Sequence, residues 1–396
     1  MAEQLALHGG SPVRATTLPY ARQTIEESDV QAVAAALRSD WLTTGPLVAA
    51  FERAIAAAVE AKHAVAVNSG TAALHAAVFA AEIGAGDEVV TSPLTFAASG
   101  NAVLYLGGTP VFADVRPDTL NLDPAAVEPV ITARTRAVLT VDFAGQPSDL
   151  DALGALARGR GLTLIEDAAH ALGATLRGRP LGGIADLTTF SFHPAKAITT
   201  GEGGMVTTGR DDLAARLRRF RNHGLETDFR ERAAAGAPYS PMVDLGYNYR
   251  LTDLQCALGL AQLGRLDAFV KRRGEIAERY AAALADQRAL RIPAVTSQGR
   301  HGWHIFPVLL EIEQLTVGRD TVLAALRAEG IGVTVHYVPV YWHPYYAARG
   351  YRRGLCPHAE AVYERLVTLP LFPAMTDRDV DDVVAALAKV LGYYAR

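Results

Sequence analysis

Ser191-Phe192-His193-Pro194-Ala195-Lys196, followed by Ile198-Thr199-Thr200-Gly201-Glu202-Gly203-Gly204, is the segment that says most about this chain. It places one lysine between a short apolar, strand-like run and a glycine-rich turn. A lysine amine can hold an aldehyde cofactor as a Schiff base. Most lysines are solvated surface charges, but this sequence context is not that of a solvated helical face, and its glycines let backbone approach a ligand closely. We therefore predict a cofactor site around Lys196.

Short apolar runs alternate with helical patterns through the first two-thirds of the chain. The strand-like runs are Val65–Val67, Glu88–Thr91, Val111–Val115, Ala137–Val141, Leu162–Ile165, Thr188–Phe192 and Met205–Thr208. This alternation predicts parallel strands covered by helices on both faces. Glu226–Ser240 is polar and rich in small residues, so we expect an exposed loop there.

The pattern changes after about Gln255, and a smaller α+β region is predicted from there on. Its expected elements are a helix over Leu260–Leu284, a strand around Trp303–Leu310, a helix around Thr321–Glu329, a strand at Val333–Val338 and a terminal helix after Asp377. The charges on the first helix indicate a solvated face. With 396 residues, two domains are expected. We place them at residues 1–255 and 256–396.

Composition excludes several classes of protein. A net charge of −4 gives no support to nucleic-acid binding, and no apolar stretch is long enough to span a bilayer. Cys256 and Cys356 are the only cysteines, which indicates neither a disulfide framework nor a zinc site. The segment from Met1 to Arg14 lacks a basic region followed by an apolar core. We therefore expect no secretory signal and a cytoplasmic protein.

Asp167 and His170 follow the strand-like run at Leu162–Ile165. Ligands bind at the carboxyl ends of strands in open parallel sheets. A carboxylate there can keep a pyridine nitrogen protonated, which makes the ring of pyridoxal 5'-phosphate (PLP) an electron sink. The alternative is that Asp167 caps a helix.

Three further residue types suit such a cofactor. Ser69-Gly70-Thr71 lies where a strand meets a helix, and free N–H groups with hydroxyls make an anion site for a phosphate. Helix capping is again the alternative. Ser191 offers another hydroxyl, and Phe96 can stack on an aromatic ring, although Phe is more often a core residue.

His336-Tyr337 and Tyr341-Trp342-His343-Pro344-Tyr345-Tyr346 form an aromatic and histidine cluster in the second domain. His336 and His343 have no third ligand at suitable spacing, so we predict no metal site. Aromatic residues with polar tips suit sugar recognition, and a core or interface role is equally consistent with the sequence.

Together these residues resemble the DegT/DnrJ/StrS family of PLP-dependent sugar aminotransferases over about Pro19 to Pro370. The specific segments are Asn68–Leu74, Glu166–Ala171, Ser191–Gly204 and Gly246–Arg250. The resemblance implies an α/β fold: an aspartate aminotransferase-like (type I) large domain with a mostly parallel sheet and a smaller α+β C-terminal domain. Relatives that act as dehydratases carry histidine in place of the lysine, so Lys196 argues against that reaction.

The resemblance also implies roles, residue by residue. Lys196, Asp167 and His170 would be catalytic: Lys196 as the Schiff-base lysine, Asp167 at the pyridine nitrogen and His170 near the phenolic oxygen of the ring. Phe96 would stack on the ring, and Ser69, Gly70 and Ser191 would contact the phosphate. Asn248 is expected to reach the cofactor phosphate of the other subunit, which implies a homodimer with shared active sites.

One branch of the family is most similar, the UDP-4-amino-4,6-dideoxy-N-acetyl-β-L-altrosamine transaminases of pseudaminic acid biosynthesis. The similar segments are Asp40–Pro46, Phe143–Pro147, Ile198–Gly204 and Val335–Val340. The branch implies amino transfer from L-glutamate to C4 of a UDP-linked 4-keto-6-deoxy-N-acetylhexosamine. Its substrate-contacting segments match Tyr20, Asp40, Trp41, Leu42, Thr43, Thr334, Val335, His336 and Tyr337. Another 4-keto or 3-keto nucleotide sugar, GDP- or dTDP-linked, and a non-catalytic regulatory homologue stay as alternatives.

Overall fold

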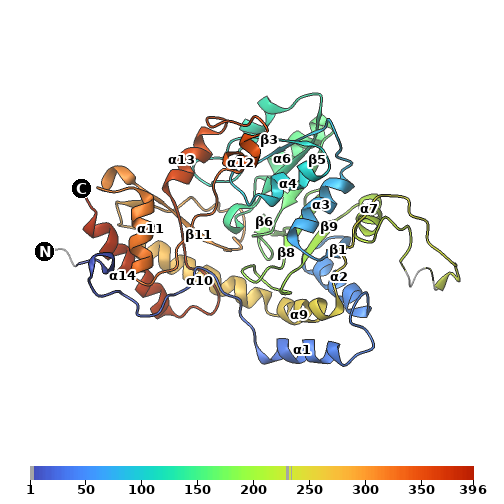
Figure 1. Cartoon of the computed structure of the whole chain (residues 1–396), viewed down its shortest axis with the longest axis horizontal. Coiled ribbons are helices and arrows are strands. Elements are labelled where there is room, and N and C mark those ends of the chain that lie inside the picture. The colour runs from blue at the N-terminus through green and yellow to red at the C-terminus, as the bar shows by residue number, and fades with distance from the viewer. Residues whose placement is uncertain (1–3, 229–231, 233) are drawn as a thin grey trace.

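A seven-stranded sheet forms the centre of the computed structural model, which describes residues 4–228, 232 and 234–396 (Figure 1). Its strands follow the order β1-β9-β8-β5-β4-β2-β3. Their bounds are β1 (His63–Val67), β2 (Glu88–Thr91), β3 (Thr109–Phe112), β4 (Thr135–Val141), β5 (Thr163–Asp167), β8 (Leu187–Ser191) and β9 (Gly204–Thr208). Each strand-like run of the sheet predicted from the sequence is therefore a strand.

The sheet is mostly parallel, as predicted. β3, β2, β4, β5 and β8 pair in parallel, whereas β9 runs antiparallel to both β8 and β1. Parallel neighbours need a crossover connection, but β8 and β9 are joined directly by residues 192–203, so the chain returns antiparallel. That connection carries Lys196 at the carboxyl end of β8.

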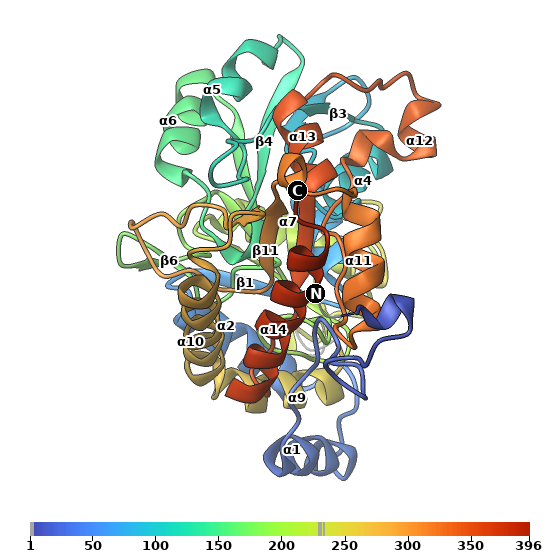
Figure 2. The same cartoon turned by 90° about the vertical axis from the view of Figure 1, so that its left-hand side faces the viewer.

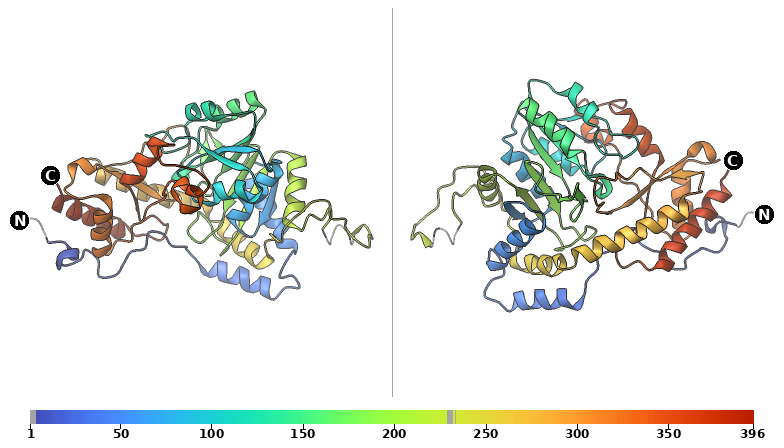
Figure 3. Two further views of the ribbon diagram at one scale, coloured as in Figure 1. Left: turned by 45° about the horizontal axis from the view of Figure 1, so that its top comes forward. Right: turned by 180° about the vertical axis from the view of Figure 1, so that it is seen from behind.

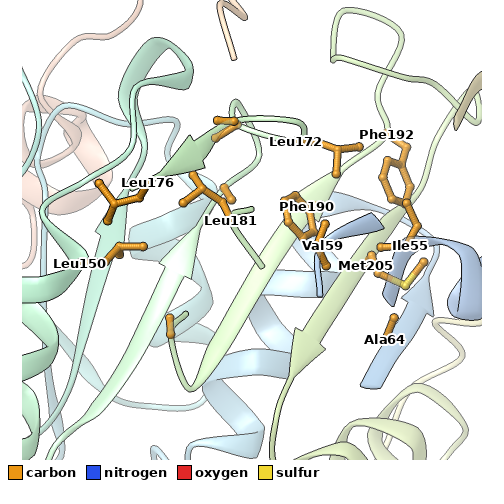
Figure 4. Packing of buried hydrophobic residues seen from close by; sticks show 14 of the residues in the cluster. Ile55, Val59, Ala64, Leu150, Leu172, Leu176, Leu181, Phe190, Phe192 and Met205 are labelled. Atoms are coloured by element: carbon orange, nitrogen blue, oxygen red, sulfur yellow. The ribbon is translucent and has the colours of Figure 1, made fainter. Parts of the chain in front are cut away.

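Helices cover both faces of this sheet (Figures 1 and 3). Those of the first two-thirds of the chain are α1 (Glu27–Leu37), α2 (Pro46–Ala58), α3 (Gly70–Ala80), α4 (Ala98–Tyr105), α5 (Pro124–Val127), α6 (Leu150–Arg160) and α7 (Asp211–Arg221). Alternation along β1 shows the two faces: Ala64 and Ala66 pack with α2, and Val65 and Val67 pack with α3. Figure 4 shows part of the first core, where Ile55 of α2 lies near Phe190 and Met205.

A smaller three-stranded antiparallel sheet lies toward the C-terminus, as the α+β pattern predicted. Its strands are β10 (Leu290–Arg291), β11 (Phe306–Leu310) and β12 (Leu366–Leu369). The helices after residue 252 are α9 (Asp253–Leu263), α10 (Leu266–Leu284), α11 (Arg319–Ala328), α12 (Pro344–Ala347), α13 (Pro357–Arg365) and α14 (Asp377–Tyr393). Figure 2 shows α11 and α14 beside the N-terminal segment, whose Leu5 and Leu18 pack in the same core.

Helix α10 belongs to both hydrophobic cores. Val270 packs in the core of the large sheet, and Ile276 packs in the C-terminal core. The division at residues 1–255 and 256–396 stays a proposal, which the two cores support.

Two predicted elements differ in the structure. The helix expected over Leu260–Leu284 is broken between α9 and α10, because Arg265 has non-helical angles and binds Glu26 and Asp29 of the α1 region. The strand expected at Val333–Val338 is reduced to one bridge, Thr334 with Thr368. Pro339 follows and lacks the N–H that a longer ladder needs.

The loop expected at Glu226–Ser240 falls partly on residues 229–231 and 233, which lie outside the described residues. The described flanks belong to an arm that extends away from the sheet (Figure 1). Two bridges join the sides of the arm, Asn222 with Asn248 and Leu225 with Met242.

Candidate active site

The turn between β8 and β9 holds Lys196 in place through its own backbone. The N–H of Phe192 donates to the carbonyl of Gly203 at 2.9 Å, and its carbonyl accepts from the N–H of Thr200 at 3.0 Å. A Cβ atom on Gly204 would collide with the backbone of Ser69. This glycine therefore allows close approach of the chain to itself, and it brings β9 against the start of α3.

A cavity of about 390 Å³ lies at the carboxyl ends of β5 and β8. It brings together many residues predicted from the sequence, and these come both from the large-sheet part of the chain and from segments beside the C-terminal core. They are Tyr20, Ser69, Gly70, Phe96, Asp167, His170, Ser191, Lys196, His336 and Tyr337. The Lys196 amine, the Asp167 carboxylate, the start of a helix and a wall of aromatic and histidine side chains thus line the same space.

The Lys196 amine loses its proton more readily than the amine of a solvent-exposed lysine. Burial lowers the pKa of Lys196 to about 8, with Arg273 lowering it further and Asp167 opposing the change. Its Nζ atom lies 3.5 Å from Nε2 of His304. An amine with this pKa can accept and return a proton near neutral pH.

Asp167 lies at the end of β5 with both carboxylate oxygens engaged. Oδ2 accepts from the Ser99 hydroxyl at 2.7 Å, and Oδ1 accepts from the N–H of Ala169 at 3.2 Å. Burial raises the pKa of Asp167, while Ser99, Ala169 and Lys196 lower it. Residues 169–173 form turns and no helix begins there, so the alternative of a helix cap is wrong.

The start of α3 forms the second end of the cavity. The Ser69 hydroxyl accepts from the N–H of Ala72 at 3.0 Å, so this residue does cap the helix. A Cβ on Gly70 would lie 2.8 Å from Cβ and 2.9 Å from Oγ of Ser191. The absence of a side chain at Gly70 lets the end of β8 approach the first turn of α3. The free N–H groups of that turn and the nearby hydroxyls make a site where a phosphate group fits.

Phe96 and Tyr337 form the aromatic wall. Phe96 is 61% exposed, and its ring centroid lies 6.1 Å from that of Tyr337. This exposure excludes the core role that a phenylalanine usually has. The ring is available to stack on a planar ligand.

Neutral histidines complete the site. Nε2 of His170 lies 3.1 Å from the Tyr337 hydroxyl, and its ring centroid lies 4.2 Å from that of His304. Burial, and then the charge of Lys196, lower the pKa of both histidines well below the usual range. Burial lowers the pKa of His336 to about 4, so all three rings are uncharged near neutral pH.

Seven residues predicted from the family resemblance lie outside this cavity. Asp40, Trp41, Leu42 and Thr43 form an exposed segment between α1 and α2. Thr334 bridges to Thr368, and Val335 packs against apolar clusters. Asn248 is exposed at the base of the arm, where its carbonyl accepts from the Asn68 amide at 3.3 Å.

The sequence argument missed Ser99, Arg273 and His304. Ser99 stands three residues after Phe96, and this spacing places it in the first turn of α4. His304 precedes the apolar run of β11, which was its one available signal. Arg273 is one of many charged residues in α10.

Within residues 4–228, 232 and 234–396, no group of three or more His, Cys, Asp or Glu residues is arranged to hold a metal ion. No helix in that part of the chain is both long and apolar enough to cross a membrane.

Known proteins share this whole architecture. The protein is 45% identical over 377 residues to the spore coat polysaccharide biosynthesis protein SpsC of Bacillus subtilis, covering 94% of this chain and 97% of SpsC. It superposes on Helicobacter pylori PseC, an aminotransferase of pseudoaminic acid biosynthesis, with a TM-score of 0.89 and 29% identity, over 96% and 100% of the two chains. The PLP-form of the sugar aminotransferase Spr1654 of Streptococcus pneumoniae gives a TM-score of 0.88 at 30% identity, over 95% and 99%.

A family assignment follows from these matches and from the site. Residues 23–388 match the DegT/DnrJ/EryC1/StrS aminotransferase family. Spr1654 has also been solved in its PMP (pyridoxamine phosphate) form, so a relative is known with both the PLP and the PMP form of the cofactor. The amine, carboxylate, phosphate-binding helix start and exposed ring described above fit this cofactor. The chain belongs to the DegT/DnrJ/EryC1/StrS aminotransferase family and is one of its PLP-dependent enzymes.

Proposed function

We propose that this enzyme transfers an amino group from L-glutamate to C4 of a UDP-linked 4-keto-6-deoxy-N-acetylhexosamine. The observation that carries the proposal is the shared cavity, in which Lys196 and Asp167 face the start of α3 and an aromatic wall. When bound there, PLP supplies an electron sink that withdraws electrons from the carbon next to the transferred nitrogen.

The protein residues move and hold the protons. Lys196, with a pKa of about 8, acts as general base and then as general acid. It takes a proton from the carbon on one side of the transferred nitrogen and returns it to the carbon on the other side. Asp167 keeps the pyridine nitrogen protonated, and its hydrogen bond from Ser99 favours the ionised carboxylate that this role requires. Ser69, Gly70 and Ser191 hold the phosphate, and Phe96 stacks on the ring.

The substrate would occupy the same cavity. Tyr20, His336 and Tyr337 line it, and their rings offer apolar faces with polar tips. Tyr20 and His336 lie with ring centroids 5.4 Å apart. Such a surface suits the proposed sugar, whose C6 methyl group is apolar and whose C3 hydroxyl, C4 ketone and N-acetyl groups are polar.

The narrow choice of sugar is supported by segments such as Ile198–Gly204 and by the similarity to PseC. A second candidate is another 4-keto or 3-keto nucleotide sugar. It is favoured by the 45% identity to SpsC, whose name places it in spore coat polysaccharide biosynthesis, against 29% to PseC. A regulatory homologue is less well supported because Lys196 and Asp167 share one cavity.

We also propose a homodimer with shared active sites. Asn248 lies outside the cavity of its own chain, at the base of an arm on which several described apolar side chains are largely exposed. Leu245 is 77% exposed, Tyr239 71% and Met242 66%. Apolar surface of this kind marks an interaction site, and a second copy would bring Asn248 to the neighbouring phosphate. Asp40–Thr43 would reach a substrate in the same way. Two buried free cysteines fit a cytoplasmic location.

Two experiments test these proposals. Lys196→Ala should abolish amination, and retained turnover by the folded variant would exclude Lys196 as the cofactor lysine. A panel of UDP-, GDP- and dTDP-linked 4-keto sugars with glutamate, scored by product mass and NMR, tests the substrate. The narrow proposal requires that the UDP-linked N-acetyl sugar be aminated far more efficiently than the others. Preference for another sugar selects the second candidate.

A further inference from the structure

Arg273 of α10 is a buried cation without an acidic partner. Its side chain is among the largest that are fully buried, with 1% exposure. Nη1 donates to three carbonyl oxygens, those of Trp303 at 3.2 Å, His304 at 3.1 Å and Leu371 at 3.0 Å. Among the described residues no carboxylate pairs with it. Buried charges are ordinarily paired, so a solitary guanidinium needs an explanation.

The location of Arg273 supplies that explanation. It lines a small cavity at the β8–β9 turn, and Lys196 lines the same cavity. His304 connects the two residues: its carbonyl accepts from Arg273, and its Nε2 lies 3.5 Å from Nζ of Lys196. Arg273 therefore binds the backbone of His304, whose ring lies beside the lysine amine.

We infer that Arg273 is a positioning residue for Lys196, whose guanidinium fixes the Trp303–His304 segment against the lysine and places a permanent positive charge behind its amine. A nearby cation disfavours a second positive charge, so the amine stays ready to accept a proton. Arginine suits this role because its guanidinium stays charged even when buried. Burial lowers the pKa of Arg273 only to about 10.

The other charged groups near Lys196 do not replace this effect. Asp167 acts in the opposite direction and raises the pKa of Lys196. His170, His304 and His336 are uncharged near neutral pH, because burial lowers the pKa of each.

Three more groups line the two cavities beside Lys196. Arg22, His193 and Glu202 are exposed to solvent, so water and salt screen their charges. Arg273 is therefore the one buried cation among the described residues around the lysine.

The inference rests on the proposed role of Lys196 as the cofactor lysine. The test distinguishes failure of that role from failure of the role inferred for Arg273. The PLP-loaded wild type, Arg273→Met and Arg273→Lys are titrated with acid and base, and the visible absorbance of the lysine-bound cofactor is followed. Arg273→Met should raise the midpoint of this titration by about one pH unit, because the charge is lost. Arg273→Lys disturbs the same packing, but the carbonyl oxygens of Trp303, His304 and Leu371 favour the charged form of its ammonium group, so its midpoint should stay near that of the wild type.

The kinetics should follow the titration. The pH profile of kcat for Arg273→Met should move by the same amount, which lowers kcat about tenfold on the acid side of the profile. A purely structural role would lower the melting temperature of both variants without separating their midpoints.

The midpoints of the two variants decide whether the charge of Arg273 acts on Lys196. Equal midpoints for the Met and Lys variants overturn the inference, even if both variants are less stable. If Arg273→Met does not fold, Arg273→Gln replaces it, because its amide can still donate to two of the carbonyls. The glutamine variant must show the same rise. Absence of the absorbance from the wild type would instead count against Lys196 as the cofactor lysine.

Discussion

The hydrogen bond from Ser99 to Asp167 gives the sharpest prediction. Ser99 is fully buried, and its hydroxyl donates to Oδ2 at 2.7 Å. Ser99→Ala removes this donor and leaves the carboxylate with the single bond from Ala169 at 3.2 Å. The ionised form of Asp167 then loses much of its stabilisation, and it is the form that the protonated pyridine nitrogen requires.

The size of the effect follows from the chemistry of the bond. A hydrogen bond to a charged group contributes about 1.5–3 kcal/mol. One pH unit corresponds to about 1.4 kcal/mol. Protonation of Asp167, which weakens PLP binding on the acid side, should therefore set in about one to two pH units higher in Ser99→Ala than in the wild type.

The assay is the dissociation constant of PLP, measured by its absorbance across a series of pH values. Thr95→Val is the matched control: Oγ1 of Thr95 lies 2.8 Å from the Ser99 hydroxyl, but it does not contact Asp167. The control should leave the rise of the PLP dissociation constant at acid pH almost unchanged. An identical rise for Ser99→Ala and the wild type would refute the reasoning, and it would show that the pKa of Asp167 does not depend on this donor.

Three further changes test separate parts of the structure. Gly70→Ala puts a Cβ 2.8 Å from Ser191, so it should lower the free energy of unfolding by about 1–3 kcal/mol and weaken PLP binding, as measured by denaturant unfolding and absorbance. Glu166→Gln alters a buried pair of acids: burial raises the pKa of Asp142 to about 6 and also raises that of Glu166, so wild-type stability should fall as pH rises toward 6, and the variant should show a shallower fall in urea unfolding. Leu245→Glu, at a site 77% exposed, should turn the proposed dimer into monomers by light scattering.

The controls and contrary outcomes differ for each change. Gly159→Ala lies on the exposed face of α6 with no atom within 4 Å of the new Cβ, so it should stabilise the protein slightly where Gly70→Ala destabilises it. The sign for the acid pair follows from raised pKa values: the folded state binds more protons, so stability is lost as pH rises. Parallel pH curves for Glu166→Gln and the wild type would show that Glu166 does not contribute to this pH dependence. A dimer that survives Leu245→Glu would place the interface elsewhere.

Local sequence patterns predict much of the candidate site. Asp167 is predicted because it follows a strand-like run, and Ser191 because its hydroxyl stands just before the lysine turn. In the structure each residue ends a strand, and strand ends meet at one edge of a parallel sheet. Ser69 and Gly70 were predicted because a strand gives way to a helix there. Both groups line the cavity. Where the reasoning was wrong, as for the strand at Val333–Val338, one long-range bridge and a following proline replaced the local preference.

The sequence by itself determined the alternation of strands and helices, the Lys196 turn and the residue types of the cofactor site, because these depend on neighbours close along the chain. Only the tertiary structure revealed what surrounds them. Ser99 reaches Asp167 from 68 residues away, and Arg273 reaches the His304 carbonyl from 31 residues away. Neither contact has a local signature, since each depends on how a helix packs against a distant strand end. The protonation of Asp167 and Lys196 is therefore set by packing.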